Sequence, residues 1–191
     1  IQLGAIASVV VLYWKRFFQS FNFYLKLLIA FLPAAVLGFL FSNQIDFLFE
    51  RVDLIALMLI LGGIVFLFID KLFHETEENG KTEVTHATAF KVGLFQVLAL
   101  VPGVSRSAAT IIGGITQKLT KQAAAEFSFF LAVPTMLAAT GYKLLTYYLD
   151  GNKFGGDQVS ILLVGNVVAF VVAFLAIRSF ISFLTNHGFK L

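Results

Sequence analysis

One short segment of this 191-residue chain, residues 102–110, holds the residue types best suited to chemistry. Arg106 lies between Ser105 and Ser107, and Thr110 follows four positions after Arg106. A guanidinium presents a planar fork of N–H donors that matches phosphate or carboxylate oxygens, and the three hydroxyls add further donors. The pattern therefore predicts a site for an anionic group.

Pro102 and Gly103 precede these donors and predict a break in the helix. We expect the next helix to begin at about Ser107, so that its first backbone N–H groups point into the same gap as Arg106. A helix N-terminus, a guanidinium and several hydroxyls together favour phosphate. We therefore predict that Pro102, Gly103, Ser107 and Thr110 bind substrate around Arg106 and Ser105.

Gln96 lies ten positions before Arg106 and faces either this cavity or another helix, and we include it among the substrate-binding candidates. A structural alternative stays open for the whole segment. In that alternative the Pro-Gly pair only kinks a helix, Arg106 pairs with a carboxylate elsewhere, and the hydroxyls satisfy backbone carbonyls. The adjacent pair Gly113-Gly114 favours close helix packing.

The composition excludes a water-soluble domain, because 59% of the residues are apolar and only 13% are charged. The chain has no Cys and three dispersed His, so we predict no metal ligands within it. The net charge of +3 does not indicate nucleic-acid binding, since Lys and Arg stand at the ends of apolar runs.

These apolar runs predict an all-α, polytopic integral membrane protein forming a single transmembrane domain over 1–191. About 17 to 25 apolar residues are needed to cross the hydrocarbon core as a helix. Two stretches, 92–104 and 107–117, are too short to cross alone, and 70–91 is a polar loop. The predicted spans are 3–18, 27–42, 54–69, 127–149 and 159–177.

The two short stretches are either one long kinked span or a re-entrant pair that returns to its starting side. A re-entrant pair places ten Lys and Arg in cytoplasmic segments against two outside, whereas a single span gives seven against five. Because cytoplasmic segments are enriched in Lys and Arg, the charges favour the re-entrant pair.

The stretch Q-V-L-A-L-V-P-G-V-S-R-S-A-A-T, residues 96–110, closely resembles the second signature of the undecaprenyl-diphosphatase family, also called the bacitracin-resistance or UppP family. Three further stretches are similar to the same family, in the same order along the chain. They are I-Q-L-G-A-I-A-S-V-V-V at 1–11, L-P-A-A-V-L-G at 32–38 and A-A-E-F-S-F-F-L-A-V-P at 124–134.

The resemblance implies a multi-pass enzyme of the bacterial plasma membrane that removes the terminal phosphate of undecaprenyl diphosphate and so recycles the lipid carrier for peptidoglycan synthesis. It also implies an inverted repeat of two re-entrant helix pairs and a divalent cation, Mg²⁺ or Ca²⁺. The expected partners are the polyprenyl diphosphate substrate and membrane lipids, with a homodimer left open.

The family's first signature, E-x-x-x-E followed by S-S-x-G-H, is absent from these residues, and so are its last helices. We therefore expect a fragment that holds half of the repeat and is inactive alone, with the metal ligands in the absent motif. Arg106 would clamp the phosphates, Ser105 would assist it, and the nucleophile and base stay open. A transporter or flippase is the alternative function, because broken helices serve anion transport too. A non-catalytic interaction protein is a third.

Overall fold

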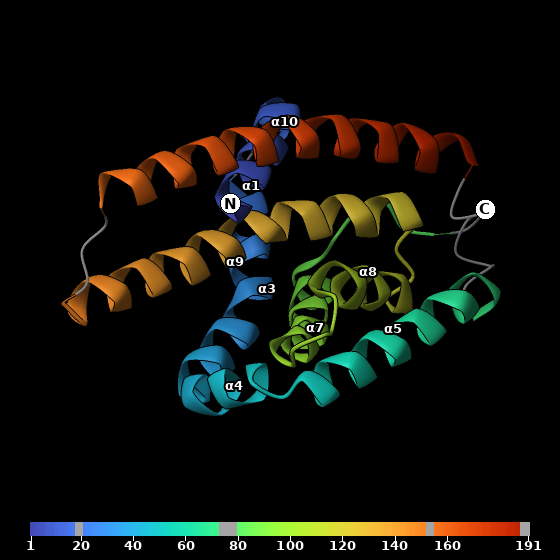
Figure 1. Ribbon diagram of the computed structural model, residues 1–191. Helices are drawn as coiled ribbons and strands as arrows, with labels where there is room; N and C mark the ends of the chain where they lie inside the picture. The colour runs from blue at the N-terminus through green and yellow to red at the C-terminus, as the bar shows by residue number, and fades with distance from the viewer. Residues whose placement is uncertain (18–20, 73–79, 152–154, 188–191) are drawn as a thin grey trace. The chain divides into compact units, whose positions relative to one another are not determined.

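The computed structural model describes residues 1–17, 21–72, 80–151 and 155–187. The chain forms two compact units. Figure 1 shows the helices in chain order by colour. Unit 1 contains Ile1–Ser20 and Ala132–Asn186, and unit 2 contains Phe21–Leu131 and His187–Leu191. Described residues outside the helices form turns, loops and one isolated β-bridge, so the predicted all-α class is confirmed. The helices are α1 (Gln2–Leu12), α2 (Trp14–Phe17), α3 (Phe21–Leu40), α4 (Ser42–Phe49), α5 (Val52–Leu72), α7 (His86–Val97), the 3₁₀ turn η1 (Leu98–Leu100), α8 (Arg106–Thr116), α9 (Lys121–Leu149) and α10 (Gly156–His187).

Small residues bring α3 and α7 together in unit 2. Gly93 of α7 lies so close to the main chain of Ala30 in α3 that a Cβ at position 93 would collide with the Ala30 carbonyl. Ala30 and Ala89 are both fully buried. Between membrane helices, small side chains allow close backbone approach and the dispersion contacts that follow from it.

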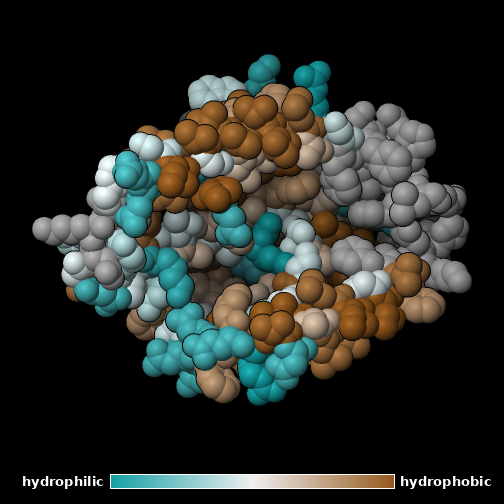
Figure 2. Space-filling view, viewed as in Figure 1, coloured by the Kyte–Doolittle hydropathy of each residue, from teal (hydrophilic) through white to brown (hydrophobic). Residues whose placement is uncertain are grey.

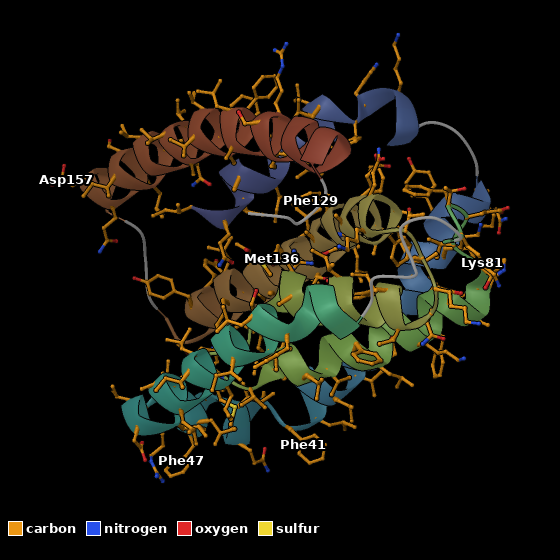
Figure 3. The ribbon with its side chains drawn as sticks, turned by 90° about the vertical axis from the view of Figure 1, so that its right-hand side faces the viewer. Phe41, Phe47, Lys81, Phe129, Met136 and Asp157 are labelled. Atoms are coloured by element: carbon orange, nitrogen blue, oxygen red, sulfur yellow. The ribbon has the colours of Figure 1, made fainter. Side chains whose placement is uncertain are left out.

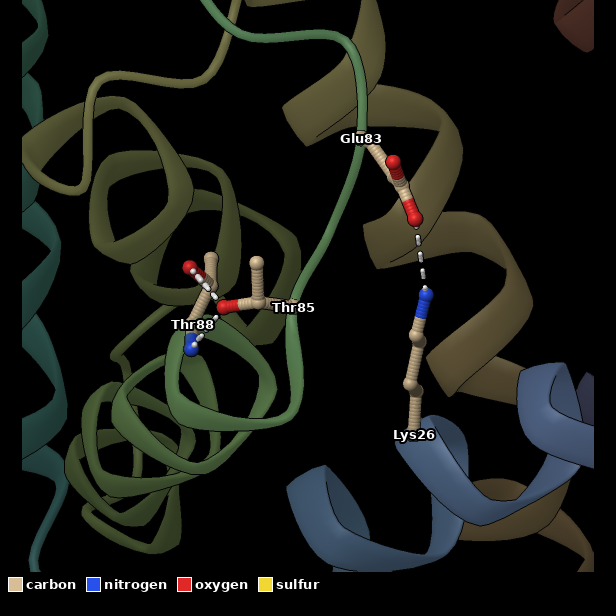
Figure 4. A network of polar contacts seen from close by, with 4 residues as sticks. All are labelled: Lys26, Glu83, Thr85 and Thr88. Carbon is tan, nitrogen blue, oxygen red and sulfur yellow. Dashed lines mark hydrogen bonds and ion pairs between the residues drawn. The ribbon is translucent and has the colours of Figure 1, made fainter.

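Polar contacts fix the start of α7 (Figure 4). The Thr85 hydroxyl caps the helix by accepting from the Thr88 amide at 3.2 Å. Just before the cap, the exposed Glu83 carboxylate lies 3.5 Å from the Lys26 ammonium on α3. The cap satisfies one of the amides that a helix start leaves without an acceptor.

The helix pair α7–η1 and α8 forms a hairpin whose two ends are hydrogen-bonded to each other. The Lys81 amide donates to the Lys118 carbonyl at 2.8 Å, and the Thr120 amide donates to the Lys81 carbonyl at 3.0 Å. A main-chain clasp therefore joins the segment before α7 to the segment after α8. A continuous kinked span could not bring these residues together, so the helix-turn-helix alternative is the one observed.

The end of α8 shapes this clasp. Lys118 has a φ of 64°, and the amides of Lys118 and Leu119 donate to the carbonyls of Ile115 and Gly114. This pair of bonds is the Schellman arrangement, in which a left-handed residue ends the helix. Leu119, only 1% exposed, then packs with Ile115 and Ala124.

Unit 1 contains α1, α2, the later part of α9 and α10. The Gly4 amide donates to the Asn166 side-chain oxygen at 2.8 Å, and a Cβ on Gly4 would overlap the Asn166 main chain. Elsewhere α10 exposes apolar side chains, which Figure 2 shows gathered on its outer surface. This surface is typical of a helix that contacts lipid.

The helix bounds differ from the predicted spans mainly at their ends. Three helical segments are long and apolar enough to cross a membrane within the described residues: Phe21–Leu40, Lys121–Leu149 and Gly156–Ser179. The predicted first span is interrupted, because α1 ends at Leu12 and a turn at Tyr13 precedes α2. The segment between the predicted second and third spans contains α4, where Phe47 is 60% exposed. Figure 3 shows Phe47 and Phe41 along the lower edge of the view. A single domain over 1–191 and the predicted spans stay predictions.

Candidate functional site

Ser105 forms the start of α8. Its backbone is extended, with φ −70° and ψ 119°, and its hydroxyl accepts from the Ala108 amide at 3.3 Å. The Ser107 hydroxyl lies 3.2 Å from the Ser105 hydroxyl. No carboxylate or imidazole contacts Ser105 within the described residues, so its neighbours there include no general base.

Arg106 is the first residue of α8 and is partly buried. Its Nη1 donates to the main-chain carbonyl of Ser128 on α9 at 3.2 Å. Among the described residues this carbonyl is the one partner of the guanidinium, and no carboxylate pairs with it. The alternative that Arg106 pairs with an acidic side chain is therefore not observed in the described part of the chain.

The start of α8 also supplies main-chain donors. The amides of Arg106 and Ser107 belong to the first turn and have no carbonyl acceptor within the helix. These amides adjoin the Arg106 Cα and directly follow the exposed Ser105. The helix start is therefore where it was predicted, and the convergence of its amides with the guanidinium and the hydroxyls on one anion stays a prediction.

Thr110 is placed differently from its neighbours. It is 1% exposed, and its hydroxyl contacts the carbonyls of Arg106 and Ser107 at 3.0 and 3.1 Å. The same hydroxyl lies 2.7 Å from the hydroxyl of Ser128, which is also 1% exposed. Thr110 therefore joins α8 to α9, and its binding of a phosphate stays a prediction.

The loop before α8 holds the other predicted residues. Pro102 is buried, and Gly103 has a φ of 91°, a conformation that favours glycine. A Cβ at Gly103 would lie 2.6 Å from the Ile55 carbonyl of α5, so the loop packs directly on that helix. Gln96 is 2% exposed on α7. Substrate contacts by these three residues stay predictions.

A family model described as bacitracin resistance protein BacA matches residues 1–191. The chain belongs to this family. The BacA membership confirms the resemblance found in the 96–110 motif. The matched residues include the whole α7–α8 hairpin.

Close relatives of this BacA chain are curated as undecaprenyl-diphosphatases. The protein of Flavobacterium psychrophilum is 58% identical over 190 residues, which are 100% of this chain and 72% of that protein. Those of Flavobacterium johnsoniae and Bdellovibrio bacteriovorus are 56% and 50% identical, again over 100% of this chain and 72% of each relative.

Ser128 is the site residue that sequence reasoning missed. It lies within the matched stretch 124–134, but a serine in an apolar helix has no local signature that separates a site contact from a bond to its own helix. Glu126, two residues before it, accepts from the Gln122 side chain at 3.2 Å. The signal available was a small polar residue inside a stretch that resembles the family.

The described residues do not form a metal centre of their own. No three His, Cys, Asp or Glu side chains come together in the described ranges. The donors around Arg106 are hydroxyls, amides and a guanidinium, which do not fit a divalent cation without carboxylates. The predicted Mg²⁺ or Ca²⁺, with ligands in the family's other signature, therefore stays a prediction.

Proposed function

We propose that this chain provides the phosphate-clamping part of a membrane undecaprenyl-diphosphate phosphatase. The proposal is based on the environment of Arg106. This partly buried cation lies at a helix start, and its one partner in the described residues is a main-chain carbonyl. A cation in a membrane protein is costly unless it has a partner or a polar cavity. An anionic diphosphate headgroup supplies the missing negative charge.

The reaction has a simple balance. Water attacks the terminal phosphorus, the bond to the bridging oxygen breaks, and the products are undecaprenyl phosphate and inorganic phosphate. Such reactions depend mainly on positioning the phosphates and neutralising their oxygens. Arg106 and the first amides of α8 do this work in the proposal, and Ser105 and Ser107 donate to non-bridging oxygens.

The lipid tail of the substrate requires an apolar surface, which a protein embedded in a bilayer provides between its helices. The proposal therefore places the enzyme in the bacterial plasma membrane, where it returns the lipid carrier to cell-wall synthesis. In the re-entrant arrangement, the segments that carry ten Lys and Arg lie on the cytoplasmic side, in keeping with the positive-inside rule. A divalent cation and a homodimer are part of the same proposal.

The test is phosphate release by a purified full-length form, in which this chain replaces the matching segment of the 58% identical relative. We expect inorganic phosphate to appear in step with loss of undecaprenyl diphosphate in detergent micelles. The transporter alternative predicts movement of the lipid or of phosphate across vesicles with the phosphoanhydride intact. Lipid movement without phosphate release would reject the proposal.

A further inference from the structure

Ser128 contacts two residues of α8 through two different atoms. Its carbonyl accepts from Arg106 Nη1 at 3.2 Å, and its hydroxyl lies 2.7 Å from that of Thr110. Arg106 and Thr110 are four residues apart and so lie on the same face of α8, one turn from each other. A single residue of α9 thus holds both ends of the first turn of α8.

The two contacts differ in what they control. The Thr110–Ser128 hydroxyl pair is fully buried, where a hydrogen bond is stronger than in water and a lost partner is costly. This pair fixes the rotation and height of α8 against α9. The Arg106 contact uses one guanidinium nitrogen. Because the guanidinium is planar and rigid, this one bond also sets the direction of its other N–H donors.

We infer that Ser128 is a positioning residue, which holds the Arg106 guanidinium in the orientation that the diphosphate requires. This inference rests on the proposed function, since it concerns the same reaction. Ser128 touches no reacting atom in this arrangement and acts through Arg106 and Thr110. A long, flexible arginine side chain loses catalytic benefit when its fork is displaced by even about 1 Å.

The first experiment measures kcat and KM for Ser128→Ala in the full-length form. We expect kcat to fall about tenfold while KM changes less than about twofold, because a misdirected fork weakens transition-state contacts more than overall binding. The matched control is Thr146→Val. Thr146 is a half-buried residue of the same helix whose hydroxyl donates to the Tyr142 carbonyl of its own helix, and this variant should keep the original kcat.

The second experiment removes the same hydrogen bond from the other side. Thr110→Val keeps the shape of the side chain but loses the hydroxyl, whereas Thr110→Ser keeps the hydroxyl. We expect Thr110→Val to lower kcat as Ser128→Ala does and Thr110→Ser to retain more activity than Thr110→Val. If Ser128→Ala does not accumulate as folded protein, the two Thr110 variants test the inference in its place.

The deciding measurement is a double-mutant cycle with Arg106→Lys. If Ser128 acts through Arg106, Ser128→Ala should cause less than about a twofold further loss of kcat once Arg106 is Lys. A loss of about tenfold in both backgrounds, or full kcat in Ser128→Ala, would overturn the inference while leaving the proposed function intact. Absence of phosphate release by the unsubstituted form would reject the proposed function itself.

Discussion

The short helix α8 and the long helix α10 are both apolar, but they use their residues in opposite ways. In α8 six of the eleven residues are buried, among them Thr110, Gly113 and Gly114, whereas none of residues 156–179 in α10 is buried. The packed helix contains small and hydroxyl residues, and the exposed helix contains large aliphatic ones. Apolar content therefore identifies a membrane protein, and small polar residues within it identify the packed site.

The largest contrast concerns the charge at the start of α8. Arg106→Lys should lower kcat/KM by about 10²- to 10³-fold, because an ammonium cannot make the two parallel contacts of a guanidinium. The matched control is Arg51→Lys, at an exposed arginine whose side chain pairs with Asp53 at 2.6 Å. Phosphate release from undecaprenyl diphosphate measures both. Near-original turnover in Arg106→Lys would show that no clamp exists.

The exposed surface of α10 is tested by introducing a charge. Val168 is 56% exposed near the middle of this helix, and Val168→Lys should cost about 2.5 to 3.5 kcal/mol on insertion. Val168→Ala should change the free energy of unfolding by less than about 0.5 kcal/mol. The membrane-inserted fraction measures the first effect and thermal unfolding in detergent measures the second. Equal tolerance of both changes would contradict a lipid contact here.

Helix packing in unit 2 gives the next contrast. Gly93→Ala should destabilise the protein by about 1 to 3 kcal/mol, because the added methyl group collides with the Ala30 main chain. The matched control is Gly62→Ala on α5, where a Cβ would meet open space. Unfolding in detergent is the measurement. Equal stability of the two variants would show that α3 and α7 do not depend on close approach.

The smallest expected effect concerns the cap of α8. Ser105→Ala should cost about 1 kcal/mol of stability and lower activity by less than Arg106→Lys does. The matched control is Ser160→Ala on α10, an exposed serine whose hydroxyl donates to the Gly156 carbonyl of its own helix. Turnover and unfolding temperature are measured for both. A loss of turnover as large as that of Arg106→Lys would indicate that Ser105 is the nucleophile.

The sequence predicted the hairpin closely because its signals are local. Pro102 and Gly103 restrict the backbone wherever they stand, and the helices end at Leu100 and begin again at Arg106 around them. The capping role of Ser105 was not predicted, although capping is local chemistry as well. The distribution of Lys and Arg also favoured a hairpin over one kinked span, and the structure contains the hairpin.

The remaining features depend on contacts between distant residues. Ser128 lies 22 positions from Arg106, and no periodicity indicates which turn of α9 meets the start of α8. The close approach of Gly103 to Ile55 is likewise a tertiary contact. The short helix α4 was not predicted because its eight residues, S-N-Q-I-D-F-L-F, are too few to show a helical period.

The clasp between Lys81 and Thr120 gives experimental access to the orientation of the whole site. Lys81 and Lys118 are both exposed, and the main-chain bonds keep them beside each other. The chain has no native thiol, so a cysteine at either position reports alone. A reagent that cannot permeate the bilayer should modify both cysteines from one compartment and neither from the other, which assigns the mouth of the hairpin to one side of the cell membrane.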